Sequence, residues 1–258
     1  MNILPLFKTH YSISRSILTA EKASDNVEEY PLSIFTIARK HNLKEICVVD
    51  DSMSGILEIS TNSELEKIKL IFGLRISISE NISIKDNYVK NKLAKYVIFC
   101  KNVNGYKNLI KISSFASVEG FNNQPIIDFV NLKRLWNDEN LILAVPFYDS
   151  FLHLNSLEGH IHVPDFSFTK PIFLLEDNDL PFDFIIENKV MVYCKDNGFN
   201  TLKAQSVYYY SPEDYEAFVT FKCIGNKGSY GKKATCEKPE LNHCCSDKFN
   251  FLRTIISK

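Results

Sequence analysis

Short apolar runs rich in β-branched residues alternate along the chain with stretches in which apolar positions recur every three or four residues. Six of the runs predict strands, at residues 45–49, 68–72, 96–100, 141–145, 172–175 and 190–193. The second of these strands is expected to close at Gly73. Helical spacing predicts helices over residues 31–41, 105–117 and 212–223. Strands that alternate with helices are typical of a mostly parallel α/β fold.

The first predicted helix shows its boundary signals clearly. Pro31 suits the first helical turn, where a missing backbone N–H costs nothing. The apolar residues Ile34, Ile37 and Ala38 would lie together on one face of the helix. Asn42 is expected to end the helix as its C-terminal cap.

Composition places the chain among globular proteins. Of its 258 residues, 45% are hydrophobic and 24% are charged, so the chain can bury a sizeable core as a single domain over residues 1–258. Residues 225–258 are expected to form a loop-rich C-terminal part. No apolar run approaches the ~20 residues of a membrane helix, and the N-terminus lacks the features of a signal peptide. We therefore expect a cytoplasmic protein with no membrane contact.

The sequence gives little support to direct binding of nucleic acids or nucleotides. A formal net charge of −1 provides no overall attraction to a phosphate backbone, so contact with DNA is expected only indirectly. The glycines Gly225, Gly228 and Gly231 do not have the spacing of a phosphate-binding P-loop.

The seven cysteines are odd in number and scattered, which suits a reducing compartment better than a disulfide framework. The group Cys236, His243, Cys244 and Cys245 is an alternative zinc site. Because it lacks a C-x-x-C pair, we favour free thiols.

Residues 101–128, KNVNGYKNLIKISSFASVEGFNNQPIID, resemble a segment of the PHP (polymerase and histidinol phosphatase) domain of the bacterial or phage DNA polymerase III alpha subunit. Further segments are similar to the same domain in the same order, at residues 8–12, 48–55, 71–75, 173–181 and 204–224. The resemblance implies a distorted (β/α)7 barrel. It also implies that residues 225–258 lead toward a polymerase region that is absent from this chain.

The resemblance further implies where the metal ligands of this family would lie. The corresponding positions here are Leu6, Lys8, Asp50, Asp51, Arg75, Ser117, Phe147, Asn178, Ser206 and Tyr208. Leucine and phenylalanine have no lone pair to donate, and the cations of lysine and arginine repel a divalent ion. We therefore interpret these residues as a vestigial, degenerate metal site. No cofactor is expected, and zinc or manganese would be bound only if the site has been rebuilt from other residues.

Some of these residues also allow a catalytic interpretation. Asp50 and Asp51 follow a predicted strand, where barrel enzymes place their chemistry, and His10 would be a general base. We favour a strand-to-loop turn for the aspartates and a structural role for His10. His160 and His162 would need a third ligand to hold a metal ion.

The substitutions suggest that cations of the protein replace the metal. If Lys8 and Arg75 lie beside Asp50 and Asp51, ion pairs would hold the vestigial pocket together. The consecutive tyrosines at residues 208–210 would pack in the core, because neighbouring side chains of a strand cannot all face one ligand.

The function implied by the resemblance is that of a catalytically inactive PHP domain, a structural and protein-docking module in DNA replication. The implied partners are polymerase domains in cis or in trans, a proofreading exonuclease or another replisome subunit. The alternative is a metal-dependent phosphoesterase or 3′–5′ proofreading exonuclease with a divergent site at Asp50, Asp51 and His10. A stand-alone protein that regulates a host or phage replisome is a third interpretation.

Overall fold

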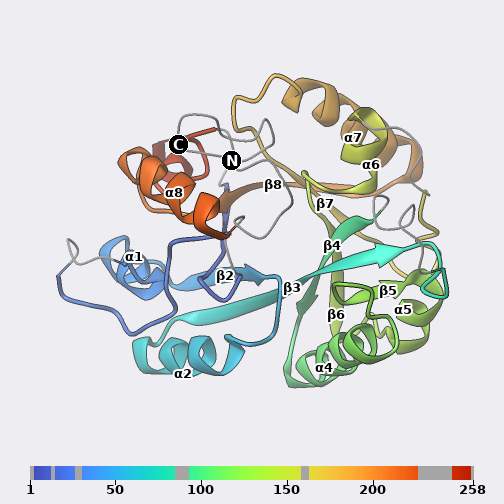
Figure 1. Cartoon of the computed structure of the whole chain (residues 1–258), viewed down its shortest axis with the longest axis horizontal. Coiled ribbons are helices and arrows are strands. Elements are labelled where there is room, and N and C mark those ends of the chain that lie inside the picture. The colour runs from blue at the N-terminus through green and yellow to red at the C-terminus, as the bar shows by residue number, and fades with distance from the viewer. Residues whose placement is uncertain are drawn as a thin grey trace. The chain divides into compact units, whose positions relative to one another are not determined.

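The computed structural model describes residues 3–12, 15–26, 31–84, 93–157, 163–225 and 246–256 (Figure 1). The strands are β1 (Leu4–Phe7), β2 (Glu45–Asp50), β3 (Lys69–Ser79), β4 (Ala94–Cys100), β5 (Ile126–Asp128), β6 (Leu141–Val145), β7 (Ile172–Leu175) and β8 (Asn200–Val207). The helices are α1 (Ile34–Lys40), α2 (Ile56–Glu66), α4 (Val103–Val118), α5 (Phe129–Leu135), α6 (Phe151–Leu157), α7 (Asp183–Asn197), the 3-10 turn η1 (Pro212–Asp214), α8 (Tyr215–Gly225) and α9 (Arg253–Ile256).

The strands pair in the order β2-β1-β8-β7-β6-β4-β3-β5, and β2 also pairs with β3. Seven of the described strands therefore form a closed barrel, to which β5 is added through β3. The pairs that β1 forms with β2 and with β8 are parallel, whereas β4 is antiparallel to both of its neighbours. The predicted α/β fold and the (β/α)7 barrel are confirmed.

By its internal contacts the chain divides into two compact units, each of which contains more than one segment. The first unit comprises Met1–Phe72, Glu176–Leu180 and Lys203–Lys258, and the second comprises Gly73–Leu175 and Pro181–Leu202. Strands β3 and β8 each contribute residues to both units. That the whole chain acts as one domain stays a prediction.

The core of the first unit forms around β1 and helix α1. Phe7, Phe35 and Val48 are fully buried there, and the ring of Phe7 stacks on that of Phe251 at 5.5 Å between centroids. Helix α1 begins after Ser33, whose Oγ accepts a hydrogen bond from the backbone N–H of Phe35 at 3.1 Å. The face predicted from the sequence is the buried one.

In the second unit, residues 101–128, which carry the family resemblance and which we call the signature segment, include helix α4, the turn that follows it and strand β5. Gly105 and Gly120 both lie where the backbone of a neighbouring segment comes very close. A Cβ atom at Gly105 would lie 2.2 Å from the carbonyl oxygen of Asn140, and one at Gly120 would lie 1.8 Å from that of Ile126. These glycines therefore serve the packing of α4 against its surroundings.

The strand predicted at residues 190–193 is wrong, because these residues belong to helix α7. The buried side chains of α7 include Ile186, Val190 and Cys194, which are spaced four residues apart, as on one face of a helix. Burial of this face outweighs the strand preference of the local valines. Gly198, in the left-handed conformation at φ 68°, caps the helix.

The predicted end of a strand at Gly73 is also wrong, since β3 continues to Ser79. Beyond Gly73, the side chains of Leu74, Ile76 and Ile78 alternate along the strand and are buried. Antiparallel pairing with β4 continues through this part of β3. Glycine here makes room for a neighbour rather than a turn, because a Cβ atom would lie 2.6 Å from the ring of Phe99.

The remaining predicted strands and helices are present, with ends that differ by a few residues. Within the described ranges, no helix is long and apolar enough to cross a membrane. Of the predicted loop-rich part at residues 225–258, the structure describes Gly225 as the last residue of α8 and residues 246–256, which include the short helix α9.

Candidate functional site

Asp50, the last residue of β2, is fully buried and accepts three hydrogen bonds from the segment that follows β1. Its Oδ1 accepts the backbone N–H of Thr9 at 2.9 Å and the hydroxyl of Ser12 at 2.7 Å. Its Oδ2 accepts the hydroxyl of Thr9 at 2.7 Å. Burial raises the pKa of Asp50, while the charge of Lys8 and these hydrogen bonds act in the opposite direction. The carboxylate thus tethers two chain segments.

Lys8 and Asp51 form the ion pair that the sequence suggested. The Nζ of Lys8 lies 3.2 Å from Oδ1 of Asp51, and the lysine side chain is only 6% exposed, against 27% for the aspartate. The backbone N–H of Asp51 donates to Oγ of Ser12 at 2.9 Å. A cation of the protein therefore lies between the end of β1 and the end of β2.

His10 does not join these carboxylates as a general base would. Its backbone N–H donates to the carbonyl oxygen of Leu18 at 2.8 Å, and its ring packs against that of Tyr11. Its Nδ1 is buried and makes no hydrogen bond within the described part of the chain. The neighbouring Tyr11 instead donates its hydroxyl to Oε2 of Glu58 at 2.6 Å.

A second buried polar cluster in the first unit surrounds Glu176, the residue directly after β7. Its Oε2 accepts the backbone N–H of Ser206 at 2.9 Å, and its Oε1 accepts the hydroxyl of Ser206 at 2.8 Å. The Nδ2 of Asn178 also approaches Oε2 at 3.4 Å. The Oδ1 of Asn178 in turn accepts a hydrogen bond of 2.7 Å from Nε2 of Gln205. The structure thus links Asn178 and Ser206 through a glutamate.

Leu6 and Tyr208 are core residues of the first unit. Leu6 is 5% exposed and pairs in register with Ser206 of β8 and Cys47 of β2. The ring of Tyr208 stacks between those of Phe218 and Phe249, at 5.6 and 5.1 Å. The predicted packing role of residues 208–210 agrees with these contacts.

In the second unit, Arg75 of β3 forms an ion pair with Asp149, which follows β6. The guanidinium side chain is 11% exposed, and the carboxylate side chain is 27% exposed. The backbone N–H of Asp149 donates to Nδ1 of His153 at 2.7 Å. Phe147 is fully buried. Ser117, by contrast, is exposed on the surface of α4.

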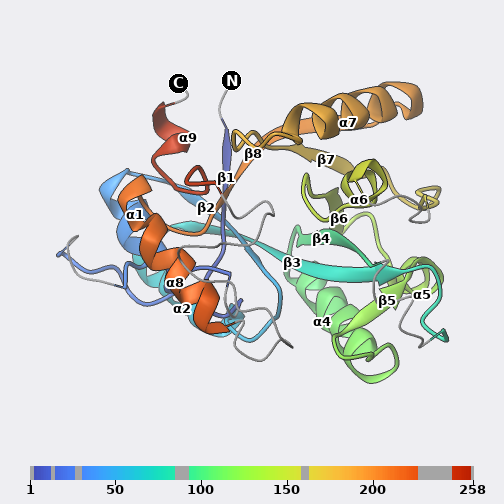
Figure 2. The same cartoon turned by 45° about the horizontal axis from the view of Figure 1, so that its top comes forward.

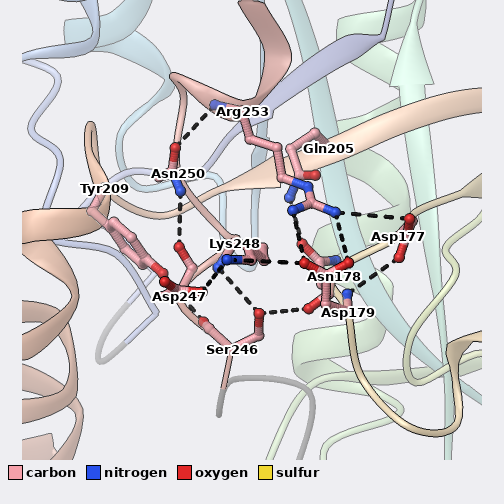
Figure 3. A network of polar contacts seen from close by, with 10 residues as sticks. All are labelled: Asp177, Asn178, Asp179, Gln205, Tyr209, Ser246, Asp247, Lys248, Asn250 and Arg253. Atoms are coloured by element: carbon pink, nitrogen blue, oxygen red, sulfur yellow. Dashed lines mark hydrogen bonds and ion pairs between the residues drawn. The ribbon is translucent and has the colours of Figure 1, made fainter. Parts of the chain in front are cut away.

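A network of polar contacts joins the C-terminal segment of the first unit, residues 246–256, to the loop after β7 (Figure 3). The guanidinium of Arg253 contacts both oxygens of Asp179 at 3.1 and 3.2 Å and lies 3.7 Å from Asp177. The hydrogen bond from Arg253 lowers the pKa of Asp179. Ser246 Oγ donates to the carbonyl oxygen of Asn178 at 2.5 Å. The loop that carries Asn178 is thereby held by cations and hydroxyls of the protein.

A family model described as the PHP domain matches residues 8–168 of the chain, which is more than half of its length. The chain belongs to the PHP domain family. The match begins at Lys8, the residue that pairs with Asp51, and includes the signature segment in α4.

Curated relatives of this PHP domain are similar to it at low identity. The "DNA polymerase III subunit alpha" of Borreliella burgdorferi is 25% identical over 210 residues, which are 74% of this chain and 18% of the relative. That of Aquifex aeolicus is 25% identical over 227 residues, 82% of this chain and 19% of the relative. That of Helicobacter pylori strain 26695 is 35% identical over 95 residues, 36% of this chain and 8% of the relative. The chain thus spans less than a fifth of these relatives.

The residues of this PHP domain do not fit the metal cluster that the family resemblance implies. Such a cluster needs several converging nitrogen, oxygen or sulfur donors. Lys8 and Arg75 bring cations that pair with Asp51 and Asp149, and the oxygens of Asp50 already accept three hydrogen bonds. Among the described residues, no group of three or more histidine, cysteine, aspartate and glutamate side chains could hold a metal ion.

Two suggested metal sites of the PHP domain cannot be placed. The possible zinc ligands Cys236, His243, Cys244 and Cys245 lie outside the described residues, as do His160 and His162. Both suggestions stay predictions.

Sequence reasoning missed several residues that organise the site. Thr9 and Ser12 supply the donors to Asp50, Glu176 organises the second cluster, and Asp149 is the partner of Arg75. Asp149 replaces the expected partners Asp50 and Asp51 for this arginine. Their place in the sequence could have indicated Thr9 and Glu176. Both residues follow the C-terminal end of a buried strand, β1 or β7, and polar residues of α/β barrels gather at such strand ends.

Proposed function

We propose that this chain is a catalytically inactive PHP domain that acts as a structural and protein-docking module in DNA replication. The observation that carries this proposal is the Lys8–Asp51 ion pair beside the carboxylate of Asp50, which accepts three hydrogen bonds. A lysine cation at this place supplies positive charge without a metal ion. It repels a divalent ion by several kcal/mol unless it is well screened, roughly as Coulomb's law predicts.

Hydrolysis of phosphoesters in such a site would need a metal ion to activate water and stabilise the leaving oxygen. The first unit instead uses its polar residues to join segments that are far apart in sequence. Asp50 links β2 to the segment after β1, and Glu176 links the loop after β7 to β8. These contacts support a scaffold role.

The replication context comes from the relatives, whose names describe alpha subunits of DNA polymerase III. Within this proposal, the partners are polymerase domains in cis or in trans, or another replisome subunit such as a proofreading exonuclease. Contact with DNA would be indirect, and the location would be the cytoplasm. The absence of the metal site, and thus of zinc or manganese as cofactor, is part of the same proposal.

A nuclease and phosphoesterase assay tests the absence of catalysis. Purified protein is incubated with a 3′-labelled single-stranded oligonucleotide and, separately, with p-nitrophenyl phosphate, in the presence of manganese or zinc. We expect no turnover above that of a control without protein. Metal-dependent cleavage that a folded Asp51→Asn variant loses, with folding checked by circular dichroism, would establish instead the divergent phosphoesterase or 3′–5′ exonuclease with Asp50, Asp51 and His10 as its candidate residues.

A further inference from the structure

Helices α4 and α5 of the second unit present a basic surface. The two helices lie side by side in both views of the chain (Figures 1 and 2). We call this surface the α4–α5 face. It is defined by six exposed residues, Lys107, Lys111, Val118, Val130, Lys133 and Arg134.

The positions of the α4 residues follow from the helical period. Leu109, Ile112 and Ala116 are buried on one side of α4, while Lys107, Lys111 and Val118 fall on the opposite side. The guanidinium of Arg134 on α5 lies 5.4 Å from the ring centroid of Phe115 on α4, one helical turn beyond Lys111. This contact joins the basic residues of the two helices into one surface.

The cations of the α4–α5 face are not neutralised by close carboxylates. Neither helix contains an acidic residue, and residues 101–134 hold five basic residues and only two acidic ones. Of those two, Asp128 is buried and caps α5, whereas Glu119 is exposed at the C-terminal end of α4, next to Val118. Within the described ranges, no carboxylate lies within 4.0 Å of any of the four cations. Hydrogen bonds from Ser167 lower the pKa of Asp165, and the charge of Lys133 is a smaller cause in the same direction.

Apolar side chains lie among these cations. Val118 is 74% exposed and Val130 is 76% exposed, and Val103 at the start of α4 is 71% exposed. Single exposed apolar residues are ordinary on protein surfaces. On the same two helices they are combined with cations that have no carboxylate within 4.0 Å in the described part of the chain. This combination indicates a surface that is complementary to a ligand with both negative charge and an apolar side.

From this complementarity we infer that the α4–α5 face binds an acidic, amphipathic segment of a partner protein. Carboxylates of the segment would pair with Lys107, Lys111, Lys133 and Arg134, and its apolar side chains would cover Val118 and Val130. The inference rests on the proposed docking function, for which it names a surface and the chemistry of the partner.

A nucleic acid fits this surface less well than a protein segment. Phosphates would satisfy the cations, but Val118 and Val130 of the face are aliphatic and offer no stacking platform for bases, and the 53% exposed ring of Phe121 lies beyond the end of α4. Phe115, the aromatic ring between the helices, is covered by Arg134. A protein segment uses both the charge and the apolar area.

The test measures binding of a fluorescein-labelled helical peptide with glutamate and leucine on one face, by fluorescence anisotropy with the full chain. The decisive variant is Lys107→Glu with Lys111→Glu. The matched control is Lys189→Glu with Lys195→Glu, which reverses two exposed lysines on α7, a helix that also carries Glu187 and Asp196. Thermal melts followed by circular dichroism check that both variants are folded.

We expect the wild type to bind the peptide, the α4 variant to bind at least about tenfold more weakly, and the α7 variant to be within about twofold of wild type. Added salt should weaken binding. Val118→Ser, which removes no charge, should weaken it several-fold and provides a second variant if the charge reversal impairs folding.

Three outcomes would overturn the inference: no binding by the wild type, equal weakening by the α4 and α7 variants, or tighter binding of an oligothymidylate than of the peptide. Dimers in sedimentation that the α4 variant loses would assign the face to a second copy of the chain and would also overturn it. None of these outcomes involves catalysis. A failed docking surface is therefore distinguishable from a failed proposal of catalytic silence.

Discussion

At the scale of single residues, the carboxylate of Asp50 is occupied by hydrogen bonds within the fold. A catalytic base or metal ligand needs a lone pair directed at the substrate or the ion. Asp50 directs its oxygens at Thr9 and Ser12 and is fully buried. The candidate catalytic residue is therefore best understood as a structural tether between β2 and the segment after β1.

Asp50→Ala should destabilise the protein by about 3 kcal/mol, because three buried donors lose their acceptor. Urea denaturation at neutral pH measures this change. Asp25→Ala is the control, since Asp25 is 99% exposed and its loss removes only a surface ion pair with Arg39. Equal stabilities of wild type and Asp50→Ala would contradict the tether.

The raised pKa of Asp50 predicts how this contribution depends on pH. A carboxyl whose pKa is raised on folding binds its proton more tightly in the native state, so its contribution is largest at low pH. The contribution declines as the pH rises from the ordinary value of 3.8 through the raised native value. Urea denaturation across this range should show the stability difference between wild type and Asp50→Ala shrinking with pH. A difference that grows with pH would refute the assignment.

The Arg75–Asp149 pair is the residue-scale test of cations that replace a metal in the second unit. Arg75→Met should destabilise the protein by about 2–4 kcal/mol, because it strands a partly buried carboxylate. Lys69→Met is the matched control. Lys69 pairs with Glu45, and both side chains are more than half exposed, at 71% and 53%, so the loss of this pair should cost at most about 1 kcal/mol. Similar melting temperatures of the two variants would show that the Arg75–Asp149 pair stabilises the protein no more than an exposed ion pair does.

At the scale of elements, the bounds of a strand or helix are predicted best where the sequence shows a single clear hydrophobic pattern. Strands β6 and β7 appear with the predicted bounds, and α4 extends the predicted helix by a few residues. The error in α7 arose because its valines suggested a strand, while its buried positions, Ile186, Val190 and Cys194, follow a helical period. Partners such as Asp149 for Arg75 depend on tertiary folding and have no local signal.

Glycine positions in the signature segment give a prediction at the same scale. Gly120→Ala should destabilise the protein by about 3 kcal/mol, because the new methyl group would meet the carbonyl oxygen of Ile126. Gly198→Ala is the control. It strains a left-handed residue in open space and should cost only about 1 kcal/mol. Chemical denaturation ranks the two, and the reverse order would show that α4 does not depend on this close approach.

At the scale of the whole molecule, the PHP barrel is retained, while most positions at which the resemblance expects metal ligands hold other residues and Asp50 keeps a carboxylate. The ring of strands is closed by backbone pairing, and the described polar residues at these positions form ion pairs and hydrogen bonds. The family and the barrel could be predicted because several short motifs of the chain occur in the same order as in the PHP domain. The contacts that residues such as Lys8 and Arg75 make could not, because they join segments distant in sequence.

The most direct test of a metal-free PHP domain is its metal content together with its response to a chelator. The protein is incubated with excess manganese or zinc, desalted and analysed by inductively coupled plasma mass spectrometry, and its thermal melt is recorded with and without EDTA. We predict far less than stoichiometric metal and a melting temperature unchanged within about 1 °C. Stoichiometric manganese or zinc with a clear loss of stability in EDTA would contradict the account.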